Sequence, residues 1–311
     1  MERLGENWTE VDNIICNGPF LIKNWQRDKS MTLVRNPDFC GRFSGNLQLV
    51  EIYIHSYSEW EIQSAMYEAD DLDNMDLTYF PPEELNRLRR QHSGDYISVP
   101  DLGVYFLVFN TQRAPFDDPQ IRRAFMMAVD RQAGVGSAVS GGAGIPAMGG
   151  LIPAGMPGHS TGIGVPYDPV GAQELMAQAG YPGGSGIPPV EIIIWPDAEV
   201  QMEGKRRSWQ ETLGVEVSFK KIPQIDIKER AKSEPSQIYL TGWMADYPDP
   251  DNILRVGFRK EMSGWDGVAF DGLVAKARRM LDQTQRLKLY QEADRILIEE
   301  AIVLPLVYGM T

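Results

Sequence analysis

Three strand-like runs decide the fold of this chain: VEIIIW at residues 190–195, VEVSFKK at 215–221 and QIYLTGW at 237–243. Each run is short and rich in β-branched or aromatic residues, as strands are. The sequence between them predicts helices over 199–213 and 225–231. Strands that alternate with helices in this way are typical of parallel sheets whose strands are joined by crossover helices. The segment therefore predicts an α/β fold.

The same texture extends to both sides of this segment. Val104 to Asn110 is a continuous apolar run, as in a strand that is buried on both faces. Asp118-Pro119 and Asp168-Pro169 each pair an N-cap residue with a proline at the first helical position, so a helix is predicted after each. Amphipathic helices are predicted at 270–282 and 285–301, and a last strand at 302–308, where no turn or cap follows.

The first hundred residues are predicted to be richer in strands. Ile14 to Trp25 and Met31 to Phe39 read as a hairpin whose polar turn covers residues 26–29. A turn centred near residue 28 would set Cys16 opposite Cys40. A cross-strand disulfide and two free, half-buried thiols both fit this spacing, and free thiols are the expectation. A strand at 47–55 and helices at 58–67 and 81–90 complete the region.

Composition excludes several classes of function. The 311 residues carry a formal net charge of −13, and so acidic a surface repels nucleic acid and anionic lipid. No apolar run approaches the roughly 20 residues of a membrane span, and the N-terminus has no basic, apolar and small-residue pattern of a signal peptide. The three histidines are isolated, and no Gly-x-Ser-x-Gly motif is present. We therefore expect no catalytic residues, metal or cofactor.

One segment stands out for binding chemistry: Gly242-Trp-Met-Ala-Asp-Tyr-Pro-Asp-Pro250, at the carboxyl end of a predicted strand. Open α/β sheets bind ligands at such ends. Asp246 lies between the aromatic residues Trp243 and Tyr247, so it could pair with a cationic group while the rings cover apolar substituents. The residues alone allow a second interpretation equally well, in which the aspartates cap the helix that begins near Asn252.

Ordered motifs along most of the chain resemble one family, the solute-binding proteins of ABC importers that bind oligopeptides and dipeptides (family 5). The motifs that carry the resemblance are Asn17-Gly-Pro-Phe20, Asn36-Pro-Asp-Phe39, Phe109-Asn-Thr111, Pro115-Phe-Asp-Asp118, Ile121-Arg122, Ala128-Val-Asp-Arg131, Pro153-Ala-Gly-Met-Pro-Gly158, Pro166-Tyr-Asp-Pro169, Gly242-Trp243 through Pro250, and Leu304-Pro-Leu306.

This resemblance implies a two-lobe architecture, periplasmic-binding-protein-like (type II, cluster C), with an incomplete first lobe. Residues 1–102 would form part of lobe I, residues 103–302 the ligand-binding lobe II, and residues 303–311 a truncated strand that crosses back to lobe I. Family members are longer at both ends, so the chain is expected to be an internal fragment. Two lobes of this kind close over a ligand by a hinge motion.

The resemblance also implies a set of ligand-binding residues. Asp246 would pair with the α-ammonium of a peptide, and backbone groups of Gly242 and Met244 would bond its main chain as an added strand. Trp243 would wall a side-chain pocket. Tyr79 and Phe80 match a first-lobe contact, although Phe80 replaces an amide that some peptide binders carry there. The further expected contacts are Tyr105 and Tyr247, with Trp265 as a stacking platform for a glycan ligand.

The function implied is therefore that of an extracytoplasmic receptor, periplasmic or at the cell surface, which delivers short peptides to the transmembrane subunits of an ABC permease. It would involve no catalysis, no cofactor and no nucleic acid. Two alternatives remain open from sequence: a ligand-sensing domain of a cytoplasmic regulatory protein, and a receptor for an oligosaccharide, a nickel chelate or an opine.

Overall fold

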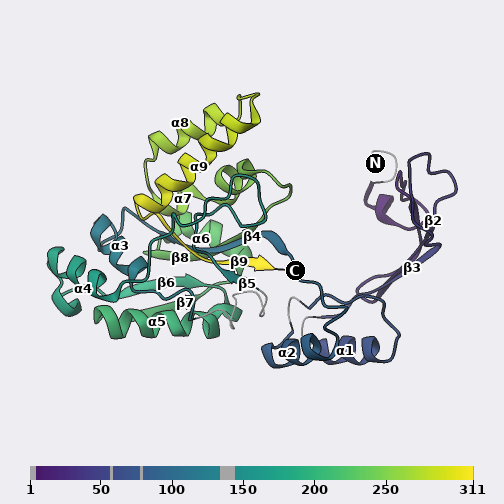
Figure 1. The fold of residues 1–311 in the computed structure, drawn as a ribbon, viewed down its shortest axis with the longest axis horizontal. Coiled ribbons are helices and arrows are strands. Elements are labelled where there is room, and N and C mark those ends of the chain that lie inside the picture. The colour runs from purple at the N-terminus through teal and green to yellow at the C-terminus, as the bar shows by residue number, and fades with distance from the viewer. Residues whose placement is uncertain (1–4, 57–58, 78–79, 134–143, 311) are drawn as a thin grey trace. The chain divides into compact units, whose positions relative to one another are not determined.

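The computed structural model describes residues 5–56, 59–77, 80–133 and 144–310. The chain divides into two compact units, residues 1–75 and residues 76–311 (Figure 1). The predicted lobe boundaries at 102/103 and 302/303 lie within the second unit and stay a prediction.

The first unit contains a three-stranded antiparallel sheet in the order β1-β2-β3. Its strands are β1 (Phe20–Gln26), β2 (Ser30–Arg35) and β3 (Leu49–Tyr53), and they are accompanied by the 3-10 helix η1 (Gly5–Thr9) and by α1 (Trp60–Glu68). The predicted hairpin is confirmed, with Gln26 opposite Ser30 and with Asp28 in the turn at φ 59°.

The hairpin strands are shorter than predicted, and this changes the position of the cysteines. β2 ends at Arg35 because the Asn36 side chain then accepts a bond from the Asp38 N–H (3.0 Å) and so forms a turn. Cys16 and Cys40 both lie beyond the paired residues and are free. The expectation of free thiols is confirmed, but Cys40 is exposed rather than half-buried.

The second unit is organised around a six-stranded sheet in the order β5-β9-β4-β8-β6-β7. The strands are β4 (Pro100–Phe109), β5 (Gly144–Pro146), β6 (Val190–Ile194), β7 (Val217–Lys221), β8 (Ile238–Met244) and β9 (Val303–Met310). β6 pairs in parallel with both β7 and β8, which confirms the predicted parallel arrangement of the three decisive runs. β4 pairs antiparallel with β8 and β9, so the sheet is mixed.

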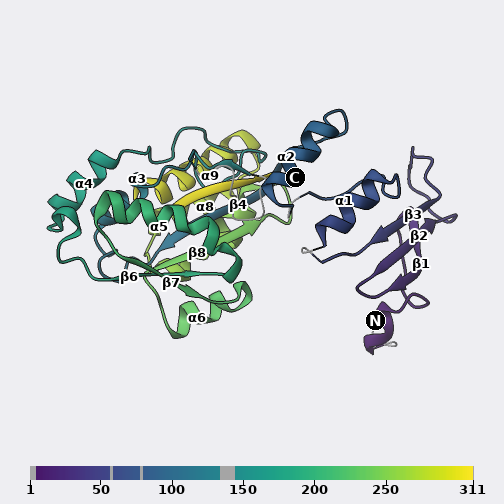
Figure 2. The ribbon, with the colours of Figure 1, turned by 90° about the horizontal axis from the view of Figure 1, so that it is seen from below.

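Helices cover both faces of this sheet: in the view of Figure 1, α5 lies below it, α8 and α9 lie above it, and α4 lies beside its left-hand end. The turned view of Figure 2 shows α6 at the β7 end of the sheet. The helices of the second unit are α2 (Pro82–Gln91), α3 (Pro119–Met127), α4 (Pro169–Gln178), α5 (Glu199–Leu213), α6 (Ile227–Ser233), α7 (Lys260–Ser263), α8 (Val268–Ala277) and α9 (Gln283–Glu299). The predicted caps at Asp118 and Asp168 are both present, because each side chain accepts a backbone N–H of its helix.

The central strands of the sheet are buried on both faces, as the apolar runs predicted. Phe106 to Phe109 on β4 and Ile192 to Ile194 on β6 are all fully buried. The helices differ from prediction mainly at their ends: α8 stops at Ala277 rather than at residue 282, and a 3-10 turn precedes α6. In the part of the chain that the structure describes, no helix is both long and apolar enough to cross a membrane.

Candidate ligand-binding site

Sheet topology brings residues 242–250, the segment that the sequence indicates for binding, to one edge of the central sheet. β6 and β8 run in parallel, so their carboxyl ends meet at the same edge, while the antiparallel β4 begins there. Met244 lies opposite Gly103, and Gly242 lies opposite Tyr105. Carboxyl ends of strands are where open α/β sheets bind ligands.

The backbone of β8 is unpaired on one side at this edge. In the described residues, pairing with β6 extends only to Tyr239. The Ala245 N–H donates to the Leu102 carbonyl on β4 (3.1 Å). Because backbone groups alternate in direction along a strand, those of Gly242 and Met244 point away from β4, toward the side that β6 has left open. A ligand main chain could therefore pair with β8 there.

Asp246 lies just beyond this open edge, and Asn252 holds its carboxylate in place. The Asn252 side-chain Nδ2 donates to Oδ2 of Asp246 (3.0 Å), and its Oδ1 accepts the Asp246 backbone N–H (3.2 Å). The same Oδ1 accepts from Nε1 of Trp243 (2.6 Å), and Asn252 itself is buried. Asp246 is exposed and forms no ion pair among the described residues. It is thus an oriented carboxylate without a cation.

The two following aspartates have structural partners instead. Asp249 makes a two-pronged ion pair with Arg286 (2.7 Å to each oxygen) and also accepts the Asp251 backbone N–H (2.9 Å). Burial acts to raise the pKa of Asp249, but the bonds from Arg286 and from Asp251 outweigh it and lower that pKa below its usual value. Asp251 pairs with Arg255 at 2.6 Å. The capping interpretation therefore fits Asp249, while Asp246 remains free to bind.

Aromatic rings line both faces of β8 at this edge. The ring of Tyr105 lies so close to Gly242 that a Cβ atom at position 242 would come within 2.6 Å of the ring. The centroid of the same ring is 6.0 Å from the centroid of the Trp195 ring. On the opposite face, the indole of Trp243 packs on Gly257, and a Cβ atom at position 257 would come within 2.5 Å of this indole. Only glycine fits at 242 and 257 without displacing a ring.

The expected ligand residues differ in exposure. Met244 and Tyr247 are 55% and 43% exposed, whereas Trp243, Tyr105 and Gly242 are half-buried. Gly242, Trp243, Met244, Asp246, Tyr247 and Tyr105 therefore come together at one edge. Tyr79 lies outside the described residues, and Phe80 is buried at 2% exposure, so a ligand contact by these two stays a prediction.

Trp265 is not brought to this edge. It follows Ser263, whose carbonyl accepts the N–H of Thr111 just beyond the opposite end of β4. At about 3.4 Å per residue, Gly103 and Thr111 are separated by roughly 27 Å. The Trp265 indole N–H is bonded to Glu300 (2.7 Å). A stacking role of Trp265 toward a ligand therefore stays a prediction.

Sequence reasoning missed two residues of this region. The sequence indicates Asn252 only as the start of a capped helix, and it gives no indication of Arg259, whose guanidinium carbon lies 5.8 Å from the Trp243 ring centroid. Neither has a local sequence signal, because each reaches the site from η5 (Asn252–Gly257, a π-helix) or from the residues after it.

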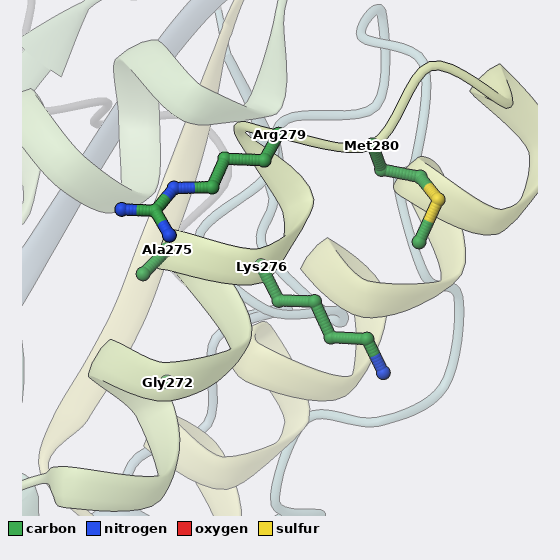
Figure 3. Close-up of a pocket in the computed structure, with 5 residues that line it drawn as sticks. All are labelled: Gly272, Ala275, Lys276, Arg279 and Met280. Atoms are coloured by element: carbon green, nitrogen blue, oxygen red, sulfur yellow. The ribbon is translucent and has the colours of Figure 1, made fainter.

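A hollow on the outer face of α8 is a separate feature. It is lined by Gly272, Ala275, Lys276, Arg279 and Met280, from α8 and the turn that follows it (Figure 3). The Lys276 and Arg279 side chains extend in different directions, and all five residues come from one short segment. Ligand sites usually surround most of a small molecule, so this open hollow is a poor candidate. Across the described ranges, no cluster of three or more His, Cys, Asp or Glu side chains could hold a metal ion.

The fold and this edge define a class: an α/β binding protein with an open strand edge and an oriented carboxylate. Residues 2–264 match the family model of bacterial extracellular solute-binding proteins, family 5, middle region. The chain belongs to this family.

Named relatives agree with this membership. Oligopeptide-binding protein OppA of Bacillus subtilis is 27% identical over 317 residues, which cover 97% of this chain and 57% of OppA. Di/tripeptide-binding protein 3 of Pseudomonas aeruginosa is 27% identical over 306 residues, which cover 95% of this chain and 56% of that protein. Heme-binding protein A of Haemophilus influenzae is also 27% identical, with 100% and 57% covered. The chain thus spans a little over half the length of these relatives.

Crystal structures show the same fold. The periplasmic oligopeptide-binding protein OppAIV of Borrelia burgdorferi superposes with a TM-score of 0.73 at 24% identity, covering 100% of this chain and 62% of that one. Haemophilus influenzae OppA in complex with the peptide RPPGFSPFR superposes with a TM-score of 0.69 at 20% identity, and the match covers 100% of this chain and 62% of that one. The predicted periplasmic-binding-protein architecture is confirmed.

Proposed function

We propose that this chain supplies the peptide-binding edge of a solute receptor for an ABC importer. The observation that carries the proposal is the open side of β8 at Gly242 and Met244, directly beside the oriented carboxylate of Asp246. A peptide has both complementary features, a main chain that pairs with a strand and an α-ammonium that pairs with a carboxylate. Peptide-binding relatives in the same family support this choice.

In this proposal the peptide lies along β8 as a short added strand. Its ammonium group binds Asp246, while Gly242 and Met244 bond its backbone and therefore accept many sequences. Tyr105, Trp243 and Tyr247 contact its side chains. Because Asn252 fixes the Asp246 carboxylate before the ligand arrives, less ordering is needed on binding. The role is binding and release, without a chemical step.

The lobe arrangement belongs to the same proposal. Residues 1–102 contribute to lobe I, 103–302 form lobe II, and 303–311 return toward lobe I. β4 and β9 are neighbouring antiparallel strands in the centre of the sheet, and they are suitably placed to act as the connecting strands of a hinge. The closed, liganded receptor would then dock on a permease outside the cytoplasm.

A thermal-shift comparison tests the proposal. Pooled di- to pentapeptides are compared with the same pools after N-acetylation, using the wild-type chain, Asp246→Asn and the control Asp266→Asn, an exposed aspartate beside Trp265. A ligand at 100 times its Kd stabilises by about 2.7 kcal/mol, enough to raise the melting temperature by a few degrees. We expect a shift with free peptides for wild type and the control only. Loss of the ammonium–carboxylate bond should weaken binding by about 1.5–3 kcal/mol.

Other results would contradict the proposal in distinct ways. Equal stabilisation by free and acetylated peptides would remove Asp246 as the ammonium partner. No stabilisation by either pool would contradict peptide binding by this chain and favour a non-peptide solute.

A further inference from the structure

The connection from β5 to α4 contains a loop, residues 148–164, whose two ends are held together. A backbone hydrogen bond of 3.1 Å joins its first and last residues. The buried guanidinium of Arg131 donates to the two carbonyls that flank the loop, those of Ala147 (2.6 Å) and Val165. Compact loops with joined ends are frequently functional.

The carboxyl group of Asp294 on α9 anchors this loop from within the core. Its oxygens accept the N–H groups of Leu151 (2.7 Å) and Ile152 (3.3 Å). The carboxyl group also packs so closely on Gly150 that a Cβ atom at position 150 would come within 2.1 Å of an oxygen. The Tyr308 hydroxyl of β9 donates to the Gly150 carbonyl (2.7 Å). One turn of the loop is thus held by both α9 and β9.

The far side of the same loop supports the candidate ligand edge. The backbone of Gly158 packs on Pro250, the last residue of the segment 242–250, and a Cβ atom at position 158 would lie 3.1 Å from it. The backbone of Gly155 packs on Pro100 at the start of β4, where a Cβ atom would lie 3.2 Å away. Because β4 pairs with β8 at this edge, a movement of the loop would remove support from both.

Asp294 is fully buried, and in the part of the chain that the structure describes no ion pair involves it. Its burial raises the pKa of its carboxyl group to about 6, although the two N–H bonds act in the opposite direction. A carboxylate in the core is stabilised when water reaches it. Ionisation of Asp294 therefore favours any state in which the loop has moved away.

Few neighbouring groups can share this titration. The titratable and charged groups packed near the turn are Tyr308 from β9, His159 from the loop, Arg131 from the segment after α3, Tyr290 one turn earlier on α9, and Asp251, which accepts the Tyr290 hydroxyl. Burial raises the pKa of both tyrosines, so they stay neutral near pH 6, and the arginine stays charged. Histidine is a residue type that changes charge near neutral pH, so His159 needs a variant of its own.

We infer that Asp294 is a positioning residue that makes ligand affinity depend on pH. With its carboxyl group protonated, it holds the 148–164 loop in place, and the loop supports the edge formed by residues 242–250. When the carboxyl group ionises, the loop loosens and the edge binds its peptide less tightly. The inference rests on the proposed function and adds the regulation of that same site. Such a receptor captures peptides best in mildly acidic surroundings.

Isothermal titration of Ala-Ala-Ala at pH 5.0, 6.0 and 7.0 tests the link to affinity. The terminal groups of this peptide change charge little over this range. It is titrated into the wild-type chain, Asp294→Asn, His159→Asn and the matched control Glu292→Gln, which removes an exposed carboxylate from the same helix. Melting temperatures measured without peptide verify that each variant is folded.

Relative to Asp294→Asn, we expect the Kd of wild type to rise about three- to tenfold from pH 5.0 to pH 7.0. The upper value corresponds to a carboxyl pKa of about 6 with the loop in place and about 4 with the loop open and the group hydrated. At pH 7.0, Asp294→Asn should bind the peptide more tightly than wild type, because the amide still accepts the Leu151 N–H and carries no charge. A merely structural role would instead weaken binding at every pH. Glu292→Gln and His159→Asn should keep the wild-type profile.

Amide hydrogen exchange without peptide tests the loop itself. The protection of the Leu151 and Ile152 N–H groups is measured relative to an unstructured peptide of the same sequence at the same pH. It should fall several-fold from pH 5.0 to pH 7.0 in wild type and stay constant in Asp294→Asn. The internal control is the Ile222 N–H, which bonds the Ile194 carbonyl (2.9 Å) in another part of the second unit. An equal fall at Ile222 would indicate global destabilisation and would contradict a local movement.

The outcomes separate the inference from the function on which it rests. If wild type binds Ala-Ala-Ala with the same pH profile as Asp294→Asn, if the loop amides keep their protection at pH 7.0, or if His159→Asn alone removes the pH dependence, the inference is overturned and the proposed function stands. If wild type binds Ala-Ala-Ala at none of the three pH values, the proposed function and the inference fail together.

Discussion

The two sheets of this molecule differ sharply in how they are covered. In the second unit, strands β4, β6 and β8 are buried on both faces, and their side chains belong to one continuous apolar core. In the first unit, the buried residues within the described ranges are two polar ones, Asn36 and Ser64. Apolar side chains of β3 and its flanks remain 41–55% exposed there, namely Leu47, Leu49, Ile52, Tyr53 and Ile54.

This difference shows where the stability of the chain resides. Apolar burial contributes roughly 25 cal/mol per Å², so the second unit gains most of the hydrophobic stabilisation. A three-stranded sheet with little burial depends mainly on its backbone hydrogen bonds and turns, which contribute little net free energy. The ligand edge lies on the well-packed sheet, where the positions of Asp246 and Trp243 are supported by a rigid core.

The strongest test of this comparison uses two tryptophans. Trp209 on α5 is fully buried and donates its indole N–H to the Phe125 carbonyl (2.9 Å), whereas Trp8 in η1 is 45% exposed. Trp209→Ala should lower the free energy of unfolding by about 3–5 kcal/mol. Trp8→Ala should lower it by less than about 1 kcal/mol. Urea unfolding followed by circular dichroism measures both, and equal losses would contradict the assignment of stability to the second unit.

A second test uses the buried charge of the large core. Asp294 on α9 is fully buried, and its oxygens accept the N–H groups of Leu151 (2.7 Å) and Ile152 (3.3 Å). Burial raises the pKa of Asp294 to about 6, although these two bonds act against the shift. At this carboxyl the folded state therefore holds a proton more tightly than the unfolded state, so the contribution of Asp294 to stability is greatest at low pH and falls as pH rises from about 4 to about 6.

The variant Asp294→Asn should lose this pH dependence, because it keeps an acceptor for Leu151 and carries no charge. At pH 7.5 we expect its free energy of unfolding to exceed that of wild type by about 1–3 kcal/mol, because no charge is buried. The loss of the longer bond from the Ile152 N–H should reduce this gain. Urea unfolding at pH 4.5, 6.0 and 7.5 measures the slope, with the exposed Asp266→Asn as control. An unchanged slope would show that Asp294 is not its source.

The smallest expected effect on stability is at the surface of the first unit. Ile52 of edge strand β3 is 41% exposed, so Ile52→Lys should change the free energy of unfolding by no more than about 0.5 kcal/mol. It should, however, reduce self-association, because a lysine on an exposed edge strand discourages strand pairing between molecules. Sedimentation velocity at increasing concentration measures this. A loss of several kcal/mol would mean that Ile52 supports a core.

Local sequence signals located most of the elements because their causes are local. Asp118-Pro119 and Asp168-Pro169 start helices through side-chain bonds to the next turn, and Asp28 allows the hairpin turn. Element ends were less predictable. The hairpin strands end where Asn36 makes its own turn, a competition that alternation of residue types does not reveal.

The sequence by itself determined the α/β class, the parallel direction of β6, β7 and β8, and the family, because apolar periodicity and ordered motifs are properties of the chain alone. Only the tertiary structure decided which aspartate is free, since Asn252 and Arg286 reach Asp246 and Asp249 from 6 and 37 residues away. It also separated Trp265 from Trp243 and placed Arg259 beside that ring. These are through-space relations, fixed by how strands and helices pack rather than by any local pattern.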